Sequence, residues 1–155
     1  MAAHFDIALE FDERERVFDV RLGPDGDLAL DLTPLTAMLV SLGVDRRAGP
    51  DDELPSGRDG TLNAASPSFN ERRGFSGDAC ARNGARTGSR LWLLDRAKQT
   101  EITRMAAEDW SREALDWAET LHGRPAEIAA SWIRRGVLAL DLGVDASELT
   151  LTRRV

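Results

Sequence analysis

The stretch TEITRMAAEDWSREALDWAETLHG (residues 100–123) and the stretch RPAEIAASWIRRGVLALDL (residues 124–142) that follows it decide the fold. In the first, Thr100 can cap a helix, and the apolar residues behind it recur every three or four positions. His122 and Gly123 are typical of a helix end. This spacing predicts one long helix whose buried face carries Ile102, Met105, Ala106, Trp110, Ala114, Trp117, Ala118 and Leu121.

After the helix the pattern changes to strict alternation of apolar and polar residues. Arg134-Arg135-Gly136 interrupts it in the manner of a turn, so a C-terminal β-hairpin is the simplest interpretation. Leu149 and Leu151 could add a last short strand. The alternating apolar residues are Ala126, Ile128, Ala130 and Trp132 before the turn, and Leu138, Leu140 and Leu142 after it.

The N-terminal part alternates in the same way from Phe5 to Phe11 and from Phe18 to Leu22, which predicts an antiparallel hairpin. A turn at residues 23–26 and a third short segment at 28–32 follow. Thr33 can cap a helix that starts at Pro34 and ends at Gly43, with Leu35, Met38, Leu39 and Leu42 on its apolar face. Ser89 can cap a further short helix over residues 91–94.

Between residues 44 and 88 the periodic patterns disappear, and Asp, Gly, Pro, Ser, Asn and Arg dominate. Loops longer than about 15 residues are usually functional or disordered. We therefore expect an extended arm that orders against neighbouring molecules. The element order predicts an α+β fold in a single domain of residues 1–155: an N-terminal hairpin and helix, the long arm 44–88, two helices and a C-terminal hairpin.

Composition excludes several classes of function. The 155 residues carry a net charge of −7, so a polyanion such as DNA would be repelled. Cys80 is the single cysteine, which rules out an intramolecular disulfide and a cysteine zinc site. The N-terminus does not resemble a secretory signal, and no stretch approaches the about 20 apolar residues of a membrane span.

Candidate catalytic groups are weak. His4 and His122 lie far apart in the sequence, the run Asp51-Asp52-Glu53 lacks calcium-loop spacing and favours a solvated acidic turn, and the glycines at 74, 77, 84 and 88 lack the lysine of a phosphate loop. Glu71 and Asp78 flank a glycine-rich segment and could form the carboxylate pair of a glycosidase. We expect no cofactor and no metal.

Binding residues are a better prospect, because Arg is enriched in protein interfaces and occurs here in pairs at 46–47, 72–73, 134–135 and 153–154. The four tryptophans fall at positions typical of a core. The pairs inside the arm are the best candidates for contacts with a partner protein.

Three blocks resemble, in order, the signature segments of the Mu-like phage baseplate wedge family: LVSLGVDRRAGPDDELP (39–55), ERRGFSGD (71–78) and GSRLWLLDRAKQT (88–100). The resemblance implies a small structural subunit of a contractile tail. A more distant resemblance, to the small wedge subunits of other contractile tails, implies a partner-contact role for Glu71, Arg72, Gly88 and Ser89. This sequence departs from the family pattern at two places. Ser76 follows Phe75 where the family usually has a second aromatic residue, and the insert at 57–70 is longer than usual. The predicted partner-binding residues are Arg46, Arg47, Glu71, Arg72, Arg73, Gly74, Gly77, Gly88 and Ser89.

The resulting hypothesis is a non-enzymatic baseplate subunit that joins wedge proteins around the hub in several symmetric copies, without contact to nucleic acid or membrane. Sheath or tube proteins are further candidate partners, and a terminal sheet could initiate sheath assembly. Such a protein would reside in the virion tail after assembly in the host cytoplasm. The alternatives are a peptidoglycan glycosidase using Glu71 and Asp78, and a soluble adaptor that binds one host protein.

Overall fold

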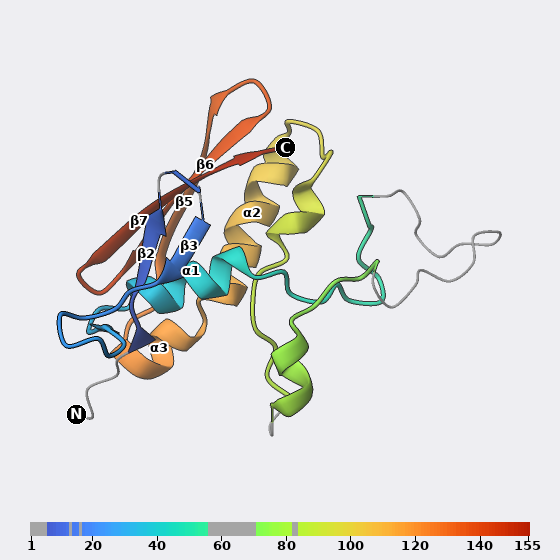
Figure 1. Ribbon diagram of the computed structural model, residues 1–155. Coiled ribbons are helices and arrows are strands. Elements are labelled where there is room, and N and C mark those ends of the chain that lie inside the picture. The colour runs from blue at the N-terminus through green and yellow to red at the C-terminus, as the bar shows by residue number, and fades with distance from the viewer. Residues whose placement is uncertain (1–5, 13, 16, 56–70, 82–83) are drawn as a thin grey trace.

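The computed structural model describes residues 6–12, 14–15, 17–55, 71–81 and 84–155. The fold is α+β, with a three-stranded antiparallel sheet covered on one face by helices (Figure 1). The body of the molecule consists of this sheet and four helical elements. The strands of the sheet are β5 (Glu127–Arg134), β6 (Val137–Val144) and β7 (Ser147–Arg154). The helical elements are α1 (Leu35–Gly43), the 3-10 helix η2 (Leu91–Leu94), α2 (Glu101–Ala114) and α3 (Trp117–His122).

The predicted cap and end of the long helical segment are confirmed. The Thr100 hydroxyl accepts a hydrogen bond from Thr103 N, at 3.2 Å, and Gly123 ends α3 with a positive φ of 73°. The prediction of one uninterrupted helix is wrong, because the chain turns at Leu115 and Asp116 and starts a second helix. Neither Gly nor Pro occurs at this break, so the sequence carries no local signal for it.

The buried face of α2 also differs from the expected one. Ile102 and Met105 are 80% and 51% exposed, whereas Ala107 and Ser111 are completely buried. The residues of α2 that face the core are therefore displaced by about one position in the sequence from the predicted apolar stripe. It consists of small residues, which let η2 and β5 approach the helix closely.

The C-terminal hairpin is confirmed, and β7 extends it to a three-stranded meander in the order β5-β6-β7. Leu140 at its centre pairs with Ala130 on one side and Leu151 on the other. The strand β7 has eight residues, more than the short segment expected. The turn before it places Asp145 at a φ of 53°, a role usually taken by Gly or Asn, so the turn signal in the sequence is weak.

The two edges of this sheet differ. At the β5 edge, Glu108 accepts a hydrogen bond from Ala130 N at 3.0 Å, and Arg104 donates one to Ala130 O at 3.3 Å. Arg104 and Glu108 also form an ion pair with each other. Side chains of α2 thus occupy the middle of the β5 edge, whereas β7 pairs with β6 alone among the described strands.

The core lies between the sheet and the helices, with α2 over β5 and α1 over β7 (Figure 1). Met38, Leu115, Leu138 and Leu140 are at most 1% exposed. Trp92 is buried as well, and the other three tryptophans are partly buried and pack against the core, which confirms the structural interpretation of these residues.

The N-terminal strands form two small antiparallel pairs, of which the second is the predicted hairpin. The strands are β1 (Asp6–Ile7) paired with β4 (Leu30–Asp31), and β2 (Leu9–Asp12) paired with β3 (Val17–Val20). Every residue of β3 is exposed. This part of the molecule therefore contributes little to the core.

The cap of α1 is supplied mainly by Asp31 rather than by the predicted Thr33. The Asp31 carboxylate accepts hydrogen bonds from the backbone and hydroxyl groups of Thr33 and Thr36, at 2.6 to 3.0 Å. Partial burial raises the pKa of Asp31, but these four hydrogen bonds outweigh it and lower the pKa below its ordinary value. The Thr33 hydroxyl makes only a 3.3 Å contact to Leu35 N.

Of the predicted arm, residues 44–55, 71–81 and 84–88 are described, and residues 56–70 and 82–83 lie outside the described part. The first segment contributes Ala48 and Leu54 to a small second core with Trp92 and Leu93. The 3-10 helix η1 (Ser76–Cys80) has no buried residue and projects from the body (Figure 1).

Candidate functional site

The two ends of the described arm lie side by side. Asp45 and Ser89 form a parallel bridge, in which Ser89 N donates to Val44 O and Arg46 N donates to Ser89 O, both at 2.9 Å. The buried Ser89 hydroxyl donates to Leu42 O, also at 2.9 Å. Ser89 therefore does not cap η2 as predicted, because its hydroxyl fastens both ends of the arm to α1.

Three of the predicted glycines occupy positions where a side chain would collide. At Gly88, with φ 98°, an added Cβ would lie 2.3 Å from a backbone oxygen of the opposing segment. At Gly74, with φ 124°, it would lie 3.0 Å from Cβ of Arg47, and at Gly77 it would lie 2.3 Å from the ring of Phe75. Close backbone approach, the reason expected from the sequence, therefore explains Gly88, whereas the atoms nearest to Gly74 and Gly77 belong to the side chains of Arg47 and Phe75.

Arg72 binds the turn that follows Ala48. Its guanidinium donates to Gly49 O and, at 3.0 Å, to Pro50 O, while its own carbonyl accepts from Ala48 N at 3.0 Å. Glu71, next to it, is half-buried. Arg72, in the second motif block, thus holds the described arm segments 44–55 and 71–81 together within the chain.

Arg73 bridges the arm and the body. It pairs with Asp45 at 2.7 Å and with Asp95 at 3.6 Å, and its guanidinium lies 4.6 Å from the ring centre of Trp92. Its carbonyl accepts a 3.4 Å hydrogen bond from Arg47. The cation–π contact and the two carboxylates together fix the orientation of this side chain.

Arg90 is the centre of a second ionic network. It binds both carboxylate oxygens of Asp52 at 3.1 Å and Glu113 at 2.9 Å, and Arg46 lies 3.7 Å from the same Glu113. Burial alone lowers the pKa of Arg90, but the hydrogen bonds and charges of Asp52 and Glu113 outweigh it and raise the pKa. The guanidinium also lies 5.7 Å from the ring centre of Trp110.

The structure thus brings Arg46, Arg47, Arg72, Arg73, Gly74, Gly88 and Ser89 together around the base of the arm, where their described contacts lie within the chain. Gly77 lies apart from them, in the projecting η1. Sequence reasoning missed Asp45, Arg90, Asp95 and Glu113. Arg90 and Asp95 lie inside the third motif block, which was the available signal. The acidic run at 51–53 is a turn as expected, but Asp52 is half-buried and bound to Arg90 and to Gly49 N.

Nothing in the described residues supports the glycosidase alternative. The Asp78 carboxylate accepts a 2.9 Å hydrogen bond from Thr87 N, which closes the loop after η1. His122 lies at the end of α3 with its ring against Trp117, and His4 is outside the described residues. Within the described ranges, no group of three or more His, Cys, Asp and Glu side chains could hold a metal ion.

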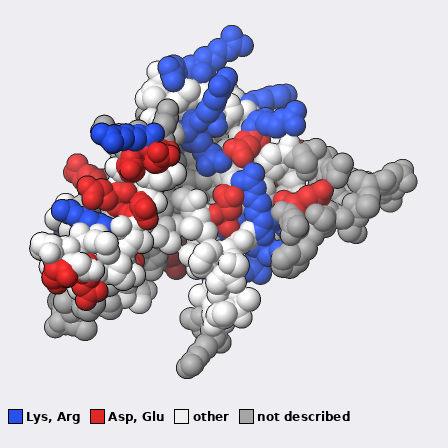
Figure 2. All heavy atoms as spheres, in the orientation of Figure 1, with Lys and Arg blue, Asp and Glu red and all other residues white. Residues whose placement is uncertain are grey.

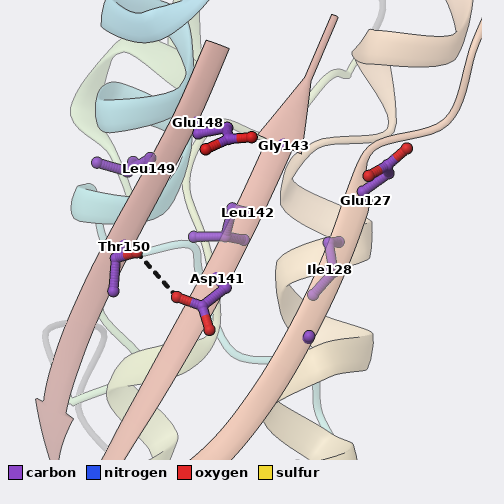
Figure 3. Close-up of a pocket in the computed structure, with 9 residues that line it drawn as sticks. Glu127, Ile128, Asp141, Leu142, Gly143, Glu148, Leu149 and Thr150 are labelled. Carbon is purple, nitrogen blue, oxygen red and sulfur yellow. Dashed lines mark hydrogen bonds between the residues drawn. The ribbon is translucent and has the colours of Figure 1, made fainter. Parts of the chain in front are cut away.

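The outward face of the C-terminal sheet has a shallow hollow of about 420 Å³ at Gly143 (Figure 3). Glu127 and Glu148 lie on either side of this glycine, and Asp141 accepts a 2.8 Å hydrogen bond from Thr150 Oγ1. The hollow results from the missing side chain of Gly143. Its lining contains the carboxylates of Glu127, Asp141 and Glu148 and is open to the surface.

Comparisons with known proteins agree with the three motif blocks. A family model described as "Phage protein GP46" matches residues 34–150. The curated "Baseplate protein gp46" of Escherichia phage Mu is 38% identical over 100 residues, which cover 64% of this chain and 60% of that protein. No solved structure matches. No helix in the described ranges has the length and apolar character needed to cross a membrane. The chain belongs to the GP46 family of phage proteins.

Proposed function

We propose that this chain is a structural, non-catalytic subunit of a phage tail baseplate, and that it resides in the virion after assembly in the host cytoplasm. The observation that carries the proposal is the 38% identity to a protein named as a baseplate protein, together with the family match over residues 34–150. This match includes the arm, α1, α2 and the whole sheet apart from the end of β7.

Within such a baseplate, the proposed role is to join wedge subunits around the hub in several symmetric copies. The arm 44–88 supplies one contact. Its base is fastened to the body, and its exposed part carries Phe75, which is 42% exposed next to Gly74 and Gly77. A side chain of this kind on a projecting, well-anchored segment suits insertion into a neighbouring subunit.

A second proposed contact is the β7 edge, directed at the sheath or tube. In an antiparallel pair, every second residue of a strand forms its backbone hydrogen bonds with the neighbouring strand. Val155 N donates to Gly136 O, so the residues two, four, six and eight positions earlier also bond to β6: Arg153, Leu151, Leu149 and Ser147. The backbone groups of Thr150 and Thr152 therefore point outward, as in sheets that accept an added strand.

The first experiment is mass spectrometry of purified tail particles that carry a photoreactive amino acid in place of Phe75. We expect the chain in intact particles and an adduct between position 75 and another baseplate subunit. Absence of the chain from intact particles would refute the structural role. Presence of the chain with an adduct only inside itself would refute the arm contact alone.

The edge contact is tested by Thr152→Pro, with Thr152→Ala as the matched control. Proline at this position removes an outward N–H without removing a bond to β6, so the fold should persist while strand addition is blocked. We expect baseplates without polymerised sheath for Thr152→Pro and normal tails for Thr152→Ala. Normal sheaths in both variants would exclude strand addition at β7.

A further inference from the structure

The hairpin of β2 and β3 has one apolar and one charged face. Phe11 pairs with Phe18, and their rings lie 5.1 Å apart, whereas the neighbouring pair is Glu10 with Asp19. Since side chains alternate along a strand, these two pairs lie on opposite faces. The first face, the N-terminal apolar face, comprises Leu9, Phe11, Phe18 and Val20, and the exposed Leu22, Leu28 and Leu30 follow it in the chain.

Most of the N-terminal apolar face is left uncovered by the described residues. Leu9 is half-buried, but Phe11, Phe18 and Val20 are between 44% and 52% exposed, although the alternation that produces them is typical of a half-buried sheet. Contiguous apolar surfaces of this kind on a folded protein mark interaction sites. Phe11 and Phe18 at its centre are residues of the type that anchors interfaces.

Charge identifies the kind of molecule that fits this face. Residues 6–32 contain nine Asp and Glu but only three Arg, so this segment accounts for six of the seven net negative charges of the chain. Figure 2, with these strands at the left, shows uncharged surface there together with acidic side chains and fewer basic ones. Such a charge repels nucleic acid, anionic lipid and a second copy of the same strands.

We propose that the N-terminal apolar face is the docking surface for a different tail subunit, one whose contact area is apolar at the centre and rich in Lys and Arg at the rim. The proposal rests on the baseplate role and goes beyond it, because the family match starts at residue 34 and leaves these strands out. They therefore form an attachment separate from the arm and from the β7 edge.

The test places the photoreactive amino acid at Phe18 in one phage and at Asp19, on the opposite face, in another. In purified tails we expect an adduct from position 18 to a peptide of another tail subunit that is rich in Lys and Arg, and a much weaker one from position 19. An adduct to a second copy of this chain, or equal adducts from both positions, would overturn the proposal.

A double variant, Phe11→Ser with Phe18→Ser, provides a second readout. Because both rings are about half exposed, the purified chain should keep its circular dichroism spectrum. Its incorporation into tails should fall about tenfold or more, as expected for the loss of aromatic anchors. Normal incorporation would refute the docking surface. If position 75 still forms its adduct while position 18 forms none, the baseplate role stands and this inference alone fails.

Discussion

The body and the N-terminal strands carry the same alternation of apolar and polar residues, yet among the described residues only the body shows a second layer packed over its apolar face. In β6, Leu138 and Leu140 are at most 1% exposed because α1 and α2 pack over the sheet. In β2 and β3, Phe11 and Phe18 are 48% and 52% exposed. Alternation thus determines which side chains share a face, and the presence of a second layer determines whether that face is buried.

The largest expected effect compares Leu140→Ala with Phe18→Ala. Leu140→Ala should lower the free energy of unfolding by about 2–5 kcal/mol, because it leaves a cavity in the core. Phe18→Ala should cost about 1 kcal/mol or less, since a half-exposed ring loses mainly its contact with Phe11. Urea unfolding followed by circular dichroism measures both. Equal costs would mean that the N-terminal strands have a core of their own.

A second comparison tests whether the base of the arm belongs to the body. Gly123→Ala should cost about 1 kcal/mol for its positive φ alone, since nothing lies within 4 Å of the added Cβ. Gly88→Ala should cost about 2 kcal/mol or more, because the Cβ also collides with the opposing backbone. Thermal unfolding of the two variants gives the difference. Similar values would indicate that residues 44 and 88 separate easily.

The ion pairs of Arg90 provide a second test of how firmly the base of the arm is held to the body. Arg90→Met should cost about 1.5–3 kcal/mol, because it leaves two half-buried carboxylates without their partner. The matched control, Arg112→Met, removes an exposed pair with Asp109 and should cost about 1 kcal/mol or less. Limited proteolysis should also cut residues 44–55 faster in Arg90→Met. Unchanged cleavage would show that the arm is held by other contacts.

The smallest expected effect concerns Asp31, which lies where the N-terminal strands meet α1. Asp31→Ala should cost about 1 kcal/mol at pH 7, as for other helix caps. Because the pKa of Asp31 is lowered in the folded state, its stabilisation is complete above the unfolded carboxyl pKa of about 3.9 and is lost as the pH falls through the lower folded value. The difference between wild type and variant should therefore shrink below pH 4.

Unfolding of both proteins at several pH values between about 2 and 7 measures this difference. Asp51→Ala, at an exposed position of the acidic turn, is the control and should change stability by less than about 0.5 kcal/mol throughout. A constant difference between wild type and Asp31→Ala would mean that the ionised carboxylate is not the stabilising form.

Elements with a strong local signal could be predicted from the sequence. The Thr100 cap, the end of α3 at Gly123 and the alternation of β5 and β6 each depend on residues within one element, and all agree with the structure. The break after Ala114 and the turn at Asp145 could not be predicted, because neither place contains the Gly or Pro that usually marks such a change.

The candidate site was harder for a different reason. The sequence indicates that Arg72 and Arg73 are suited to ionic contacts, but it offers 27 carboxylates and many carbonyl oxygens as partners. The contact of Arg72 with Gly49 and Pro50 spans more than 20 positions and follows from how the arm folds back. Which contacts these residues make with other subunits stays a prediction.

The unequal edges of the C-terminal sheet limit how many strands one copy can accept. Among the described residues, Arg104 and Glu108 already bind the middle of the β5 edge, so in this sheet the β7 edge is better suited to the proposed strand addition. Strand addition at β7, if it takes place as proposed, would give each copy one acceptor edge in this sheet. In a ring of such copies, the number of strands recruited there would equal the number of copies.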